Sequence, residues 1–296
     1  MTDRGAGPTP ATETLARVAD DTPLDLRERI ALAGIQQRML GSVAERPVVD
    51  GRYELGRELG AGGMGVVRLA HDRQLDREVA IKFLRMGRAA CRTDERRLAR
   101  EARALARISH PHVVEVFDVR VTPEAFFVAM EYVSGVSLRR WTLQQDRHWS
   151  EILAVYRQAA LGLRAVHEAG LVHRDFKPAN VMVGDDGRVR VVDFGLARPE
   201  EHSPTDEGSS QGRAAGPWSG EFSGMTRTGV VHGTPGYASP EQMRGLGVGP
   251  AGDQFSWCVA LYEALCGQRP FRPEDIARAG WSRALPPVEW PKTSPV

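Results

Sequence analysis

Residues 173–180, with the sequence HRDFKPAN, place one carboxylate, one amide and two cationic side chains within eight positions. Thirteen residues after Asn180 stands Asp193, at the end of the apolar run 189–192. The side-chain oxygens of Asn180 and Asp193 are hard ligands that suit Mg²⁺, an ion that commonly shares its coordination with substrate phosphates. Asp175 could orient a hydroxyl group and accept its proton. These residues indicate chemistry on a phosphate-bearing substrate.

A glycine-rich segment adds a second element of such a site. Gly60, Gly62 and Gly65 fit the pattern G-x-G-x-x-G. In a dinucleotide-binding fold these glycines lead from a strand into a helix, but residues 66–69 (VVRL) have the composition of a strand. The tip of a glycine-rich hairpin can instead lie close over phosphates, because its backbone approaches them without a Cβ clash. An ordinary glycine-rich turn is the alternative.

Lys82 closes the apolar run 79–82 (VAIK). Burying a lysine at the end of a strand is costly unless its charge is paired. Glu101 lies at the border of the apolar face of the next expected helix and is the expected partner. Such a pair would hold the ammonium group toward phosphate oxygens. The alternative is a lysine that extends to solvent beside a solvated glutamate.

The elements that must position these residues differ between the two halves of the chain. The first half is rich in strands, with one amphipathic helix that buries Leu98, Ala102, Leu105 and Ile108. In the second half, a helix with an apolar stripe ends before Gly170, and Asp186-Gly187 marks a hairpin turn. The expected strands are 53–59, 66–69, 79–83, 113–121, 125–133, 181–183 and 189–192, and the expected helices are 93–108, 151–169 and 254–267. Residues 198–229 are expected to form a long polar loop.

Length and composition exclude several classes of protein. The chain has 296 residues, a net charge of +1 and 42% hydrophobic residues, so it can build a real core and gives no case for a nucleic-acid binder. Cys91, Cys258 and Cys266 cannot all pair and are expected to be free thiols in a reducing compartment. Residues 1–50 are expected to be a disordered linker, with a weak amphipathic helix over 24–40.

Taken together and in order, these segments resemble the signature of bacterial eukaryotic-like (Hanks-type) serine/threonine protein kinases. The glycine-rich loop, VAIK at 79–82, HRDFKPAN at 173–180, DFG at 193–195 and SPE at 239–241 carry the resemblance, which runs from about Tyr53 to Phe271. It implies an α+β, bilobal protein kinase fold. A small antiparallel-sheet lobe over 53–133 would carry one main helix, and 134–296 would form a mostly helical lobe.

The resemblance also implies a role for each matching residue. Asp175 would be the catalytic base, Lys177 would steady the γ-phosphate, and Lys82 paired with Glu101 would bind the α- and β-phosphates. Asn180 and Asp193 would hold Mg²⁺ or Mn²⁺. The ATP site would be formed by the three glycines of the loop together with Val67, Ala80, Met130 as gatekeeper, the hinge from Glu131 to Val133, and Met182.

Regulation and partners are implied in the same way. Arg174 beside the catalytic aspartate is typical of kinases that are switched on by phosphorylation of a loop. Thr226 and Thr228 are expected autophosphorylation sites, with plain surface threonines as the alternative, and Thr234 with Lys177 favours serine/threonine specificity. The expected partners are ATP, protein substrates and a second copy of the chain for phosphorylation in trans. Nucleic acid is not expected.

Two departures from the family pattern bear on function. The segment 199–225 is longer than usual, and the chain stops at Val296 without the last helices of the family, including the arginine that pairs with Glu241. The sequence therefore predicts a truncated second lobe. This chain is expected to be cytoplasmic, and membrane attachment through a missing C-terminal region is left open. A regulatory pseudokinase or scaffold, and a small-molecule phosphotransferase of similar fold, are the alternatives to an active protein kinase.

Overall fold

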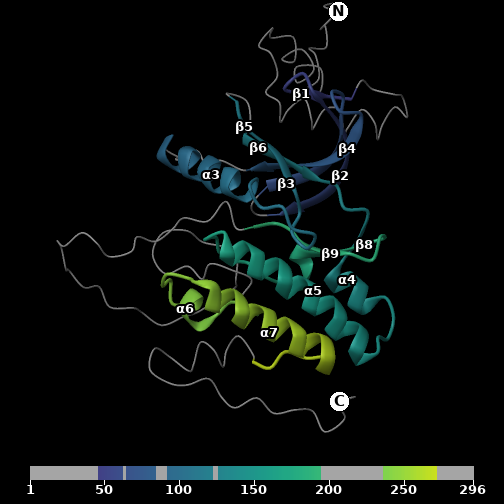
Figure 1. Cartoon of the computed structure of the whole chain (residues 1–296), viewed down its shortest axis with the longest axis vertical. Coiled ribbons are helices and arrows are strands. Elements are labelled where there is room, and N and C mark those ends of the chain that lie inside the picture. Colours follow the sequence, from purple (N-terminus) through teal and green to yellow (C-terminus); the bar gives the residue numbers. More distant parts are fainter. Residues whose placement is uncertain (1–45, 63–64, 85–91, 123–125, 195–235, 272–296) are drawn as a thin grey trace, which may run out of the picture.

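A computed structural model describes residues 46–62, 65–84, 92–122, 126–194 and 236–271, and the side chains of 92–98 lie outside this description. The upper part of the molecule is a six-stranded sheet with the strand order β1-β2-β3-β4-β6-β5 (Figure 1). All neighbouring strands in it are antiparallel. The strands are β1 (Val48–Val49), β2 (Tyr53–Gly62), β3 (Gly65–Asp72), β4 (Arg77–Leu84), β5 (Val116–Val121) and β6 (Phe126–Glu131).

The two faces of this sheet carry different side chains. Successive side chains of a strand alternate between faces, and residues paired across strands share a face. Val79, Ile81, Phe127 and Ala129 therefore lie on one face, where they build a separate apolar cluster with Tyr53 and Leu55. The opposite face carries Lys82 and the residues around it, so the sheet itself directs the reactive side chains toward the rest of the molecule.

Helix α3 (Arg92–Leu105) lies against β5, beside the sheet (Figure 1). Its Ala102 and Leu105 are buried in the main core, as is Ile108 just beyond the helix, which confirms the predicted apolar face for these residues. The helix ends three residues before the predicted end at 108, because the chain turns at 106–107.

The lower part contains α4 (Leu138–Leu143), α5 (Trp149–Glu168), α6 (Pro240–Met243) and α7 (Pro250–Cys266). A small antiparallel sheet of β7 (Gly135–Ser137), β8 (Val181–Gly184) and β9 (Val189–Val191) lies between the upper sheet and these helices (Figure 1). A short 3₁₀ helix, Pro178–Asn180, leads into β8. An antiparallel-sheet lobe and a mostly helical lobe confirm the predicted fold class.

Helices α5 and α7 form the centre of the lower lobe. In α5 the predicted stripe is confirmed, since Ile152, Val155, Ala159, Leu163 and Val166 are all buried. Gly170 follows the helix at φ +75°, the left-handed conformation expected of a glycine at this position. Reciprocal bonds lock the two helices together: the Tyr156 hydroxyl donates to the Ala260 carbonyl at 2.9 Å, and the Trp257 indole donates to the Tyr156 carbonyl at 3.0 Å.

Several boundaries differ from the sequence-based expectation. Strand β5 begins at Val116, not 113, because Val113 makes only an isolated bridge to Val191. The sequence did not predict β1, β7, α4, α6 or the 3₁₀ helix. The expected helix 24–40 and the loop 198–229 lie outside the described residues.

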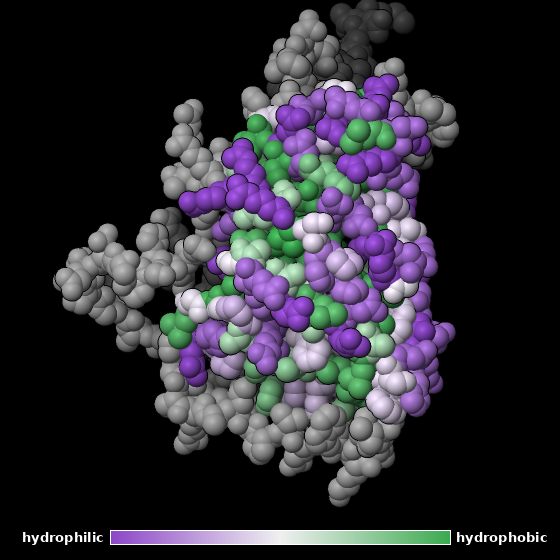
Figure 2. All heavy atoms as spheres, in the orientation of Figure 1, coloured by the Kyte–Doolittle hydropathy of each residue, from purple (hydrophilic) through white to green (hydrophobic). Residues whose placement is uncertain are grey.

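The described surface is largely polar. On the face shown in Figure 2, hydrophilic residues predominate and hydrophobic residues show in small groups. The exposed large hydrophobic side chains are scattered over separate elements: Leu75, Val121, Leu143, Trp149, Leu153 and Leu246. Among the helices that the structure describes, none combines the length and apolar character needed to cross a membrane.

Candidate active site

A single buried carboxylate binds the backbone at the start of the reactive segment 173–180. Asp253, in the first turn of α7 and 1% exposed, accepts the amide of His173 at 2.7 Å and the amide of Arg174 at 2.8 Å. Its Oδ2 also lies 2.8 Å from the His167 Nε2. Arg174 sits at φ +62°, a conformation that non-glycine residues rarely adopt, so these bonds offset a local backbone cost.

His173 is the second structural anchor of this turn. Its ring is fully buried against Phe176 and Phe194, and burial lowers the pKa of its imidazole. Nδ1 accepts the Asp175 amide at 3.2 Å, while Nε2 lies 3.0 Å from the Val192 carbonyl and donates to it. The neutral ring therefore joins the turn to the strand that precedes Asp193.

Asp175 stands at the centre of a small polar cluster. Its Oδ2 accepts from the Lys177 ammonium at 3.0 Å and from the Asn180 amide at 3.2 Å. Asn180 also donates to the Asp175 carbonyl at 2.9 Å. Both Asp175 and Asn180 are buried, so the orientation of the carboxylate is set by the protein. The structure thus brings together three of the predicted site residues.

Lys82 is only 3% exposed, and its ammonium group forms an ion pair with Asp193. This pairing joins β4 of the upper sheet to the segment after β9, across 111 residues of sequence. Asp193 also has a left-handed backbone, at φ +65°. Glu101 is half-buried on α3, and its predicted pairing with Lys82 stays a prediction.

The predicted metal ligands fit a hard divalent cation. Asn180 uses its amide nitrogen in the bonds to Asp175, which directs that nitrogen away from the role of ligand and leaves the amide oxygen for a cation. Asp193 is the more exposed of the two and supplies a carboxylate. The Val192 amide donates to the Asn180 carbonyl at 3.0 Å, so the two ligand-bearing segments are bonded side by side. An amide oxygen and a carboxylate are the donor set that Mg²⁺ takes.

Strand register places several predicted nucleotide contacts on one face of the upper sheet. Val67 pairs with Lys82, and Ala80 pairs with Met130. Ala80 and Lys82 are two residues apart on β4, so all four side chains share this face. Met182 lies on β8 of the small sheet, opposite Arg190 in the register.

The glycine-rich segment forms the turn end of the β2–β3 hairpin, as predicted, with Gly62 paired to Gly65. Gly65 adopts φ +149°, and a Cβ there would lie 1.9 Å from the Phe83 carbonyl oxygen. A Cβ on Gly60 or Gly62 would meet nothing within 4 Å. Only Gly65 is therefore required by the hairpin itself, and the other two leave open space over the sheet.

The predicted hinge begins at the last residue of β6. The Glu131 amide donates to the Glu115 carbonyl at 2.9 Å, so this amide is already used within the protein. The Glu131 side chain lies on the face opposite to Met130, where its carboxylate pairs with Arg190. Val133 packs against the main core.

Two residues that support the site were not among those predicted from the sequence. Gln242 donates its amide to the Arg174 carbonyl at 2.5 Å, and Arg190 is a buried arginine in the strand before Asp193. Arg190 interrupts an otherwise apolar strand, which is a signal that could have identified it. The predicted regulatory threonines Thr226, Thr228 and Thr234 lie outside the described residues.

Glu241 is partly buried next to α7, and within the described part of the chain its carboxylate makes no ion pair.

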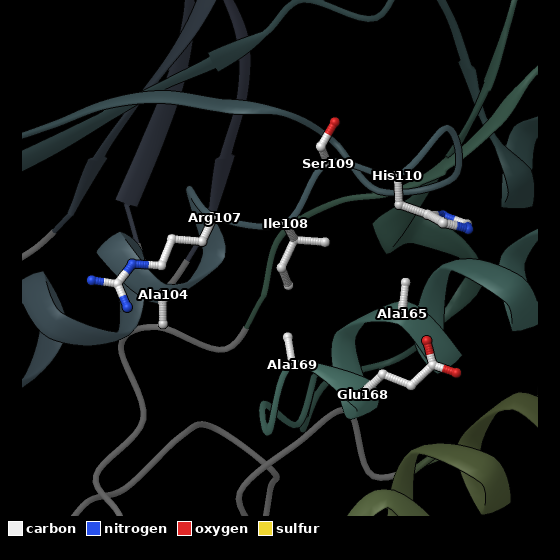
Figure 3. Close-up of a pocket in the computed structure, with 8 residues that line it drawn as sticks. All are labelled: Ala104, Arg107, Ile108, Ser109, His110, Ala165, Glu168 and Ala169. Carbon is white, nitrogen blue, oxygen red and sulfur yellow. The ribbon is translucent and has the colours of Figure 1, made fainter.

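A cavity elsewhere is distinct from the candidate site. It lies between the end of α3 and the end of α5, with a volume of about 460 Å³, and includes Arg107, His110 and Glu168 (Figure 3). None of the predicted site residues lines it.

Comparison with known proteins supports the assignment that this geometry indicates. Residues 53–286 match the family described as "Protein kinase domain". The chain is 40% identical over 228 residues to the serine/threonine-protein kinase PknB of Mycolicibacterium smegmatis, covering 74% of this chain and 33% of PknB. It is 34% identical over 227 residues to the serine/threonine-protein kinase PrkC of Bacillus subtilis, covering 76% of this chain and 32% of PrkC. The chain thus spans about a third of the length of these curated relatives.

Solved structures lead to the same family. The crystal structure of the Mycobacterium tuberculosis PknI kinase domain aligns with a TM-score of 0.59 at 25% identity, covering 84% of each chain. The match to the kinase domain extends over most of the chain and includes every predicted catalytic and metal-binding residue. The chain therefore belongs to the protein kinase family, among the bacterial Hanks-type serine/threonine kinases.

Proposed function

We propose that this chain transfers the γ-phosphoryl group of ATP to serine and threonine hydroxyls of protein substrates. One observation carries the proposal: the cluster Lys177–Asp175–Asn180 in the lower lobe and the pair Lys82–Asp193, which joins the two lobes, adjoin through the bond between Val192 and Asn180. Phosphoryl transfer needs positioning and charge neutralisation more than covalent assistance, and these clusters supply both.

Each residue has a task that follows from its contacts. Asp175 is oriented by Lys177 and Asn180, so its carboxylate can align a substrate hydroxyl and take its proton. Lys177 adds a positive charge where the transferred phosphoryl group would pass. Lys82 is buried on the sheet face that carries Val67 and Ala80, so its ammonium can meet phosphate oxygens once a nucleotide lies there.

Asn180 and Asp193 would hold the divalent cation, which when bound neutralises charge on the phosphate oxygens. Lys82 and Asp193 form an ion pair with each other. The ammonium that would meet the phosphates and the carboxylate that would hold the cation therefore lie side by side. The boundary between the lobes would fall at 133–134, and Met130, Val133 and Met182 would border the adenine.

The test is incorporation of labelled phosphate from γ-labelled ATP into a generic protein substrate, with Mg²⁺ or Mn²⁺ present. Asp193→Asn is expected to reduce incorporation by about 100-fold or more, because it removes a charge from the cation site. Asp76→Asn is the matched control. Asp76 also has a left-handed backbone, at φ +50°, but it lies on an exposed turn between β3 and β4.

Two results would decide against the proposal. If the wild type binds ATP but transfers no label, the chain is a binding or regulatory module and not an active kinase. If label enters small molecules but no protein, the chain is a small-molecule phosphotransferase. Equal incorporation by the wild type and Asp193→Asn would remove the assigned role of that carboxylate.

We also propose that the enzyme is regulated by autophosphorylation at Thr226 and Thr228, in trans between two copies. The support is the position of Arg174, beside the catalytic aspartate and held in place by Asp253 and Gln242. A phosphate adds about −1.5 to −2 charges and can pair with arginine to order a loop. Mapping of phosphopeptides after incubation with ATP tests this, and finding neither threonine modified would contradict it.

The two cysteines in the described part of the chain bear on the cellular setting. Cys258 is exposed and Cys266 half-buried, and both are free. We propose that this domain works in a reducing compartment, as is typical of cytoplasmic enzymes. Stable activity in the presence of millimolar reductant, and loss of activity on mild oxidation, are the expected results. Activity that survives only under oxidising conditions would contradict the proposal.

A further inference from the structure

Arg190 is a buried cation that the proposed chemistry does not use. It lies on β9, is 5% exposed, and binds two carboxylates from different elements. Its Nε lies 2.7 Å from Glu131 Oε1, at the end of β6. Its two terminal nitrogens donate to Asp186, at 2.9 and 3.2 Å. A planar guanidinium can satisfy both partners at once, which an ammonium group cannot do with the same geometry.

The same hairpin binds the hinge at a second point. Asp185 follows β8, and its amide donates to the Ser134 carbonyl at 2.8 Å. In return the Ser134 hydroxyl donates to the Asp185 carboxylate at 2.5 Å. One residue later, Gly135 pairs with Gly184 in the small sheet. The segment 131–135 is therefore fastened at both of its ends to the β8–β9 hairpin.

The open end of this hairpin carries the predicted cation ligands. Asn180 immediately precedes β8, and Asp193 follows β9 by two residues. The Val192 amide closes this end by its bond to the Asn180 carbonyl at 3.0 Å. The β8–β9 hairpin, labelled in Figure 1, thus contacts the hinge near its turn and carries the predicted cation ligands at its open end.

The Glu131 side chain is placed so that it can be held without blocking the nucleotide. Met130 shares a face with Ala80 and Lys82, so Glu131 lies on the other face of the sheet. Arg190 is paired in the small sheet with Met182, the residue expected at the adenine. Its contact with Glu131 is made on the side of the upper sheet opposite to Ala80, Met130 and Lys82.

We propose that Arg190 is a positioning residue that fixes the hinge 131–135 relative to Asn180 and Asp193, and so sets the separation at which the base and the phosphates of ATP are bound together. The inference rests on the proposed function, because it assigns adenine to the hinge and the cation to the two oxygen ligands. Arg190 itself touches neither the substrate nor the reacting atoms.

The experiment compares Arg190→Met with Arg188→Met. Arg188 is the matched control because it lies on the same hairpin and also binds Asp186, at 2.8 Å, but is exposed and does not contact Glu131. Arg190→Met is expected to raise the KM for ATP by about 10-fold and to change kcat by less than about threefold, since binding geometry and not the chemical step is disturbed. Arg188→Met is expected to change neither by more than about twofold.

Two further variants guard against a trivial loss of folding. Arg190→Lys keeps the charge, and its KM for ATP is expected to be only about threefold above that of the wild type. Glu131→Gln leaves the backbone of the hinge intact and is expected to raise the KM to a similar extent as Arg190→Met. The double variant Arg190→Met/Glu131→Gln is expected to be no worse than either single variant, because both remove one interaction.

The outcomes separate this inference from the proposed function. If the wild type transfers no phosphate, the same comparison is made on the dissociation constant for ATP measured by calorimetry, and the expected 10-fold weakening still tests Arg190. A lower melting temperature for Arg190→Met with an unchanged KM and dissociation constant would overturn the inference and leave Arg190 a purely structural residue. Additive effects of the two single variants would also overturn it.

Discussion

Replacing Asp253 with asparagine should damage the catalytic turn from the helix beneath it. The carboxylate accepts three hydrogen bonds, from the amides of His173 and Arg174 and from the ring of His167, at 2.7 to 2.8 Å. An asparagine offers one acceptor oxygen in place of two. Whichever way the amide turns, at least one backbone amide faces an NH₂ group and loses its acceptor.

The magnitude follows from the bonds that change. A hydrogen bond to a charged group contributes about 1.5–3 kcal/mol, and a neutral bond about 0.5–1.5 kcal/mol. Asp253→Asn removes at least one charged bond and converts the others to neutral ones, which is partly offset because no carboxylate then has to be buried. We expect the free energy of unfolding to fall by about 3 kcal/mol.

The catalytic effect should be larger than stability alone explains. Arg174 is held at φ +62° by these bonds, so their weakening lets the turn relax and moves Asp175. A displacement of about 1 Å in a catalytic group can cost about 100-fold in rate, and we expect kcat to fall by about that factor. The assay is kcat at a temperature where urea denaturation shows that the variant is fully folded.

Asp72→Asn is the control for this prediction. Asp72 is equally buried, and Arg52 binds it through two nitrogens at 2.7 and 2.6 Å, which lowers the pKa of its carboxyl group. Its loss should cost a similar amount of stability and leave kcat within about twofold, because Asp72 lies at the end of β3, on the face opposite to Val67 and Lys82. If Asp253→Asn keeps kcat within about threefold of the wild type while folded, the argument that Asp253 sets the catalytic turn is refuted.

Three further predictions concern stability. Gly65→Ala should lower the unfolding free energy by about 3 kcal/mol or more by urea denaturation, since its Cβ would meet the Phe83 carbonyl, whereas Gly62→Ala should change it by less than about 1 kcal/mol. Gly162→Ala, whose Cβ would lie 2.2 Å from the His112 carbonyl oxygen, should destabilise the lower lobe by about 3 kcal/mol; an unchanged melting temperature would contradict this packing. Burial lowers the pKa of His173, so below pH 6.5 this side chain binds a proton more readily in the unfolded chain than in the folded protein. The free energy of unfolding should therefore decrease as the pH falls below 6.5, by up to about 1.4 kcal/mol per pH unit. His173→Gln should lose this component of the slope between pH 6.5 and 5, and an identical slope in both proteins would count against it.

Local pattern was sufficient for much of the fold and for the list of site residues. The apolar runs of β3 and β4, the glycines at the β2–β3 hairpin and the apolar stripe of α5 could each be recognised from local residue types. The sequence 173–180 and Asp193 could be assigned because hard oxygen ligands and a carboxylate stand close together in the chain. Such signals are short-range and do not depend on how the lobes pack.

What could not be predicted depends on contacts between distant residues. Lys82 meets Asp193 across 111 residues, and Gln242 reaches the Arg174 carbonyl across 68, which no local periodicity encodes. Strand β7 has three residues and α4 has six, too few for a period to be visible. The ends of α3 and β5 were missed because the chain there turns to satisfy tertiary contacts and not a change in residue type.

The bonds from Asp253 to two consecutive amides also decide how the molecule opens. The donors belong to the catalytic turn and the acceptor to the first turn of α7, so neither amide can reach solvent until that helix end detaches. Hydrogen exchange at 173 and 174 should therefore follow the exchange of α7, and not that of an ordinary surface loop. Helix and turn then form one cooperative unit, in which loosening the end of α7 also releases the catalytic turn.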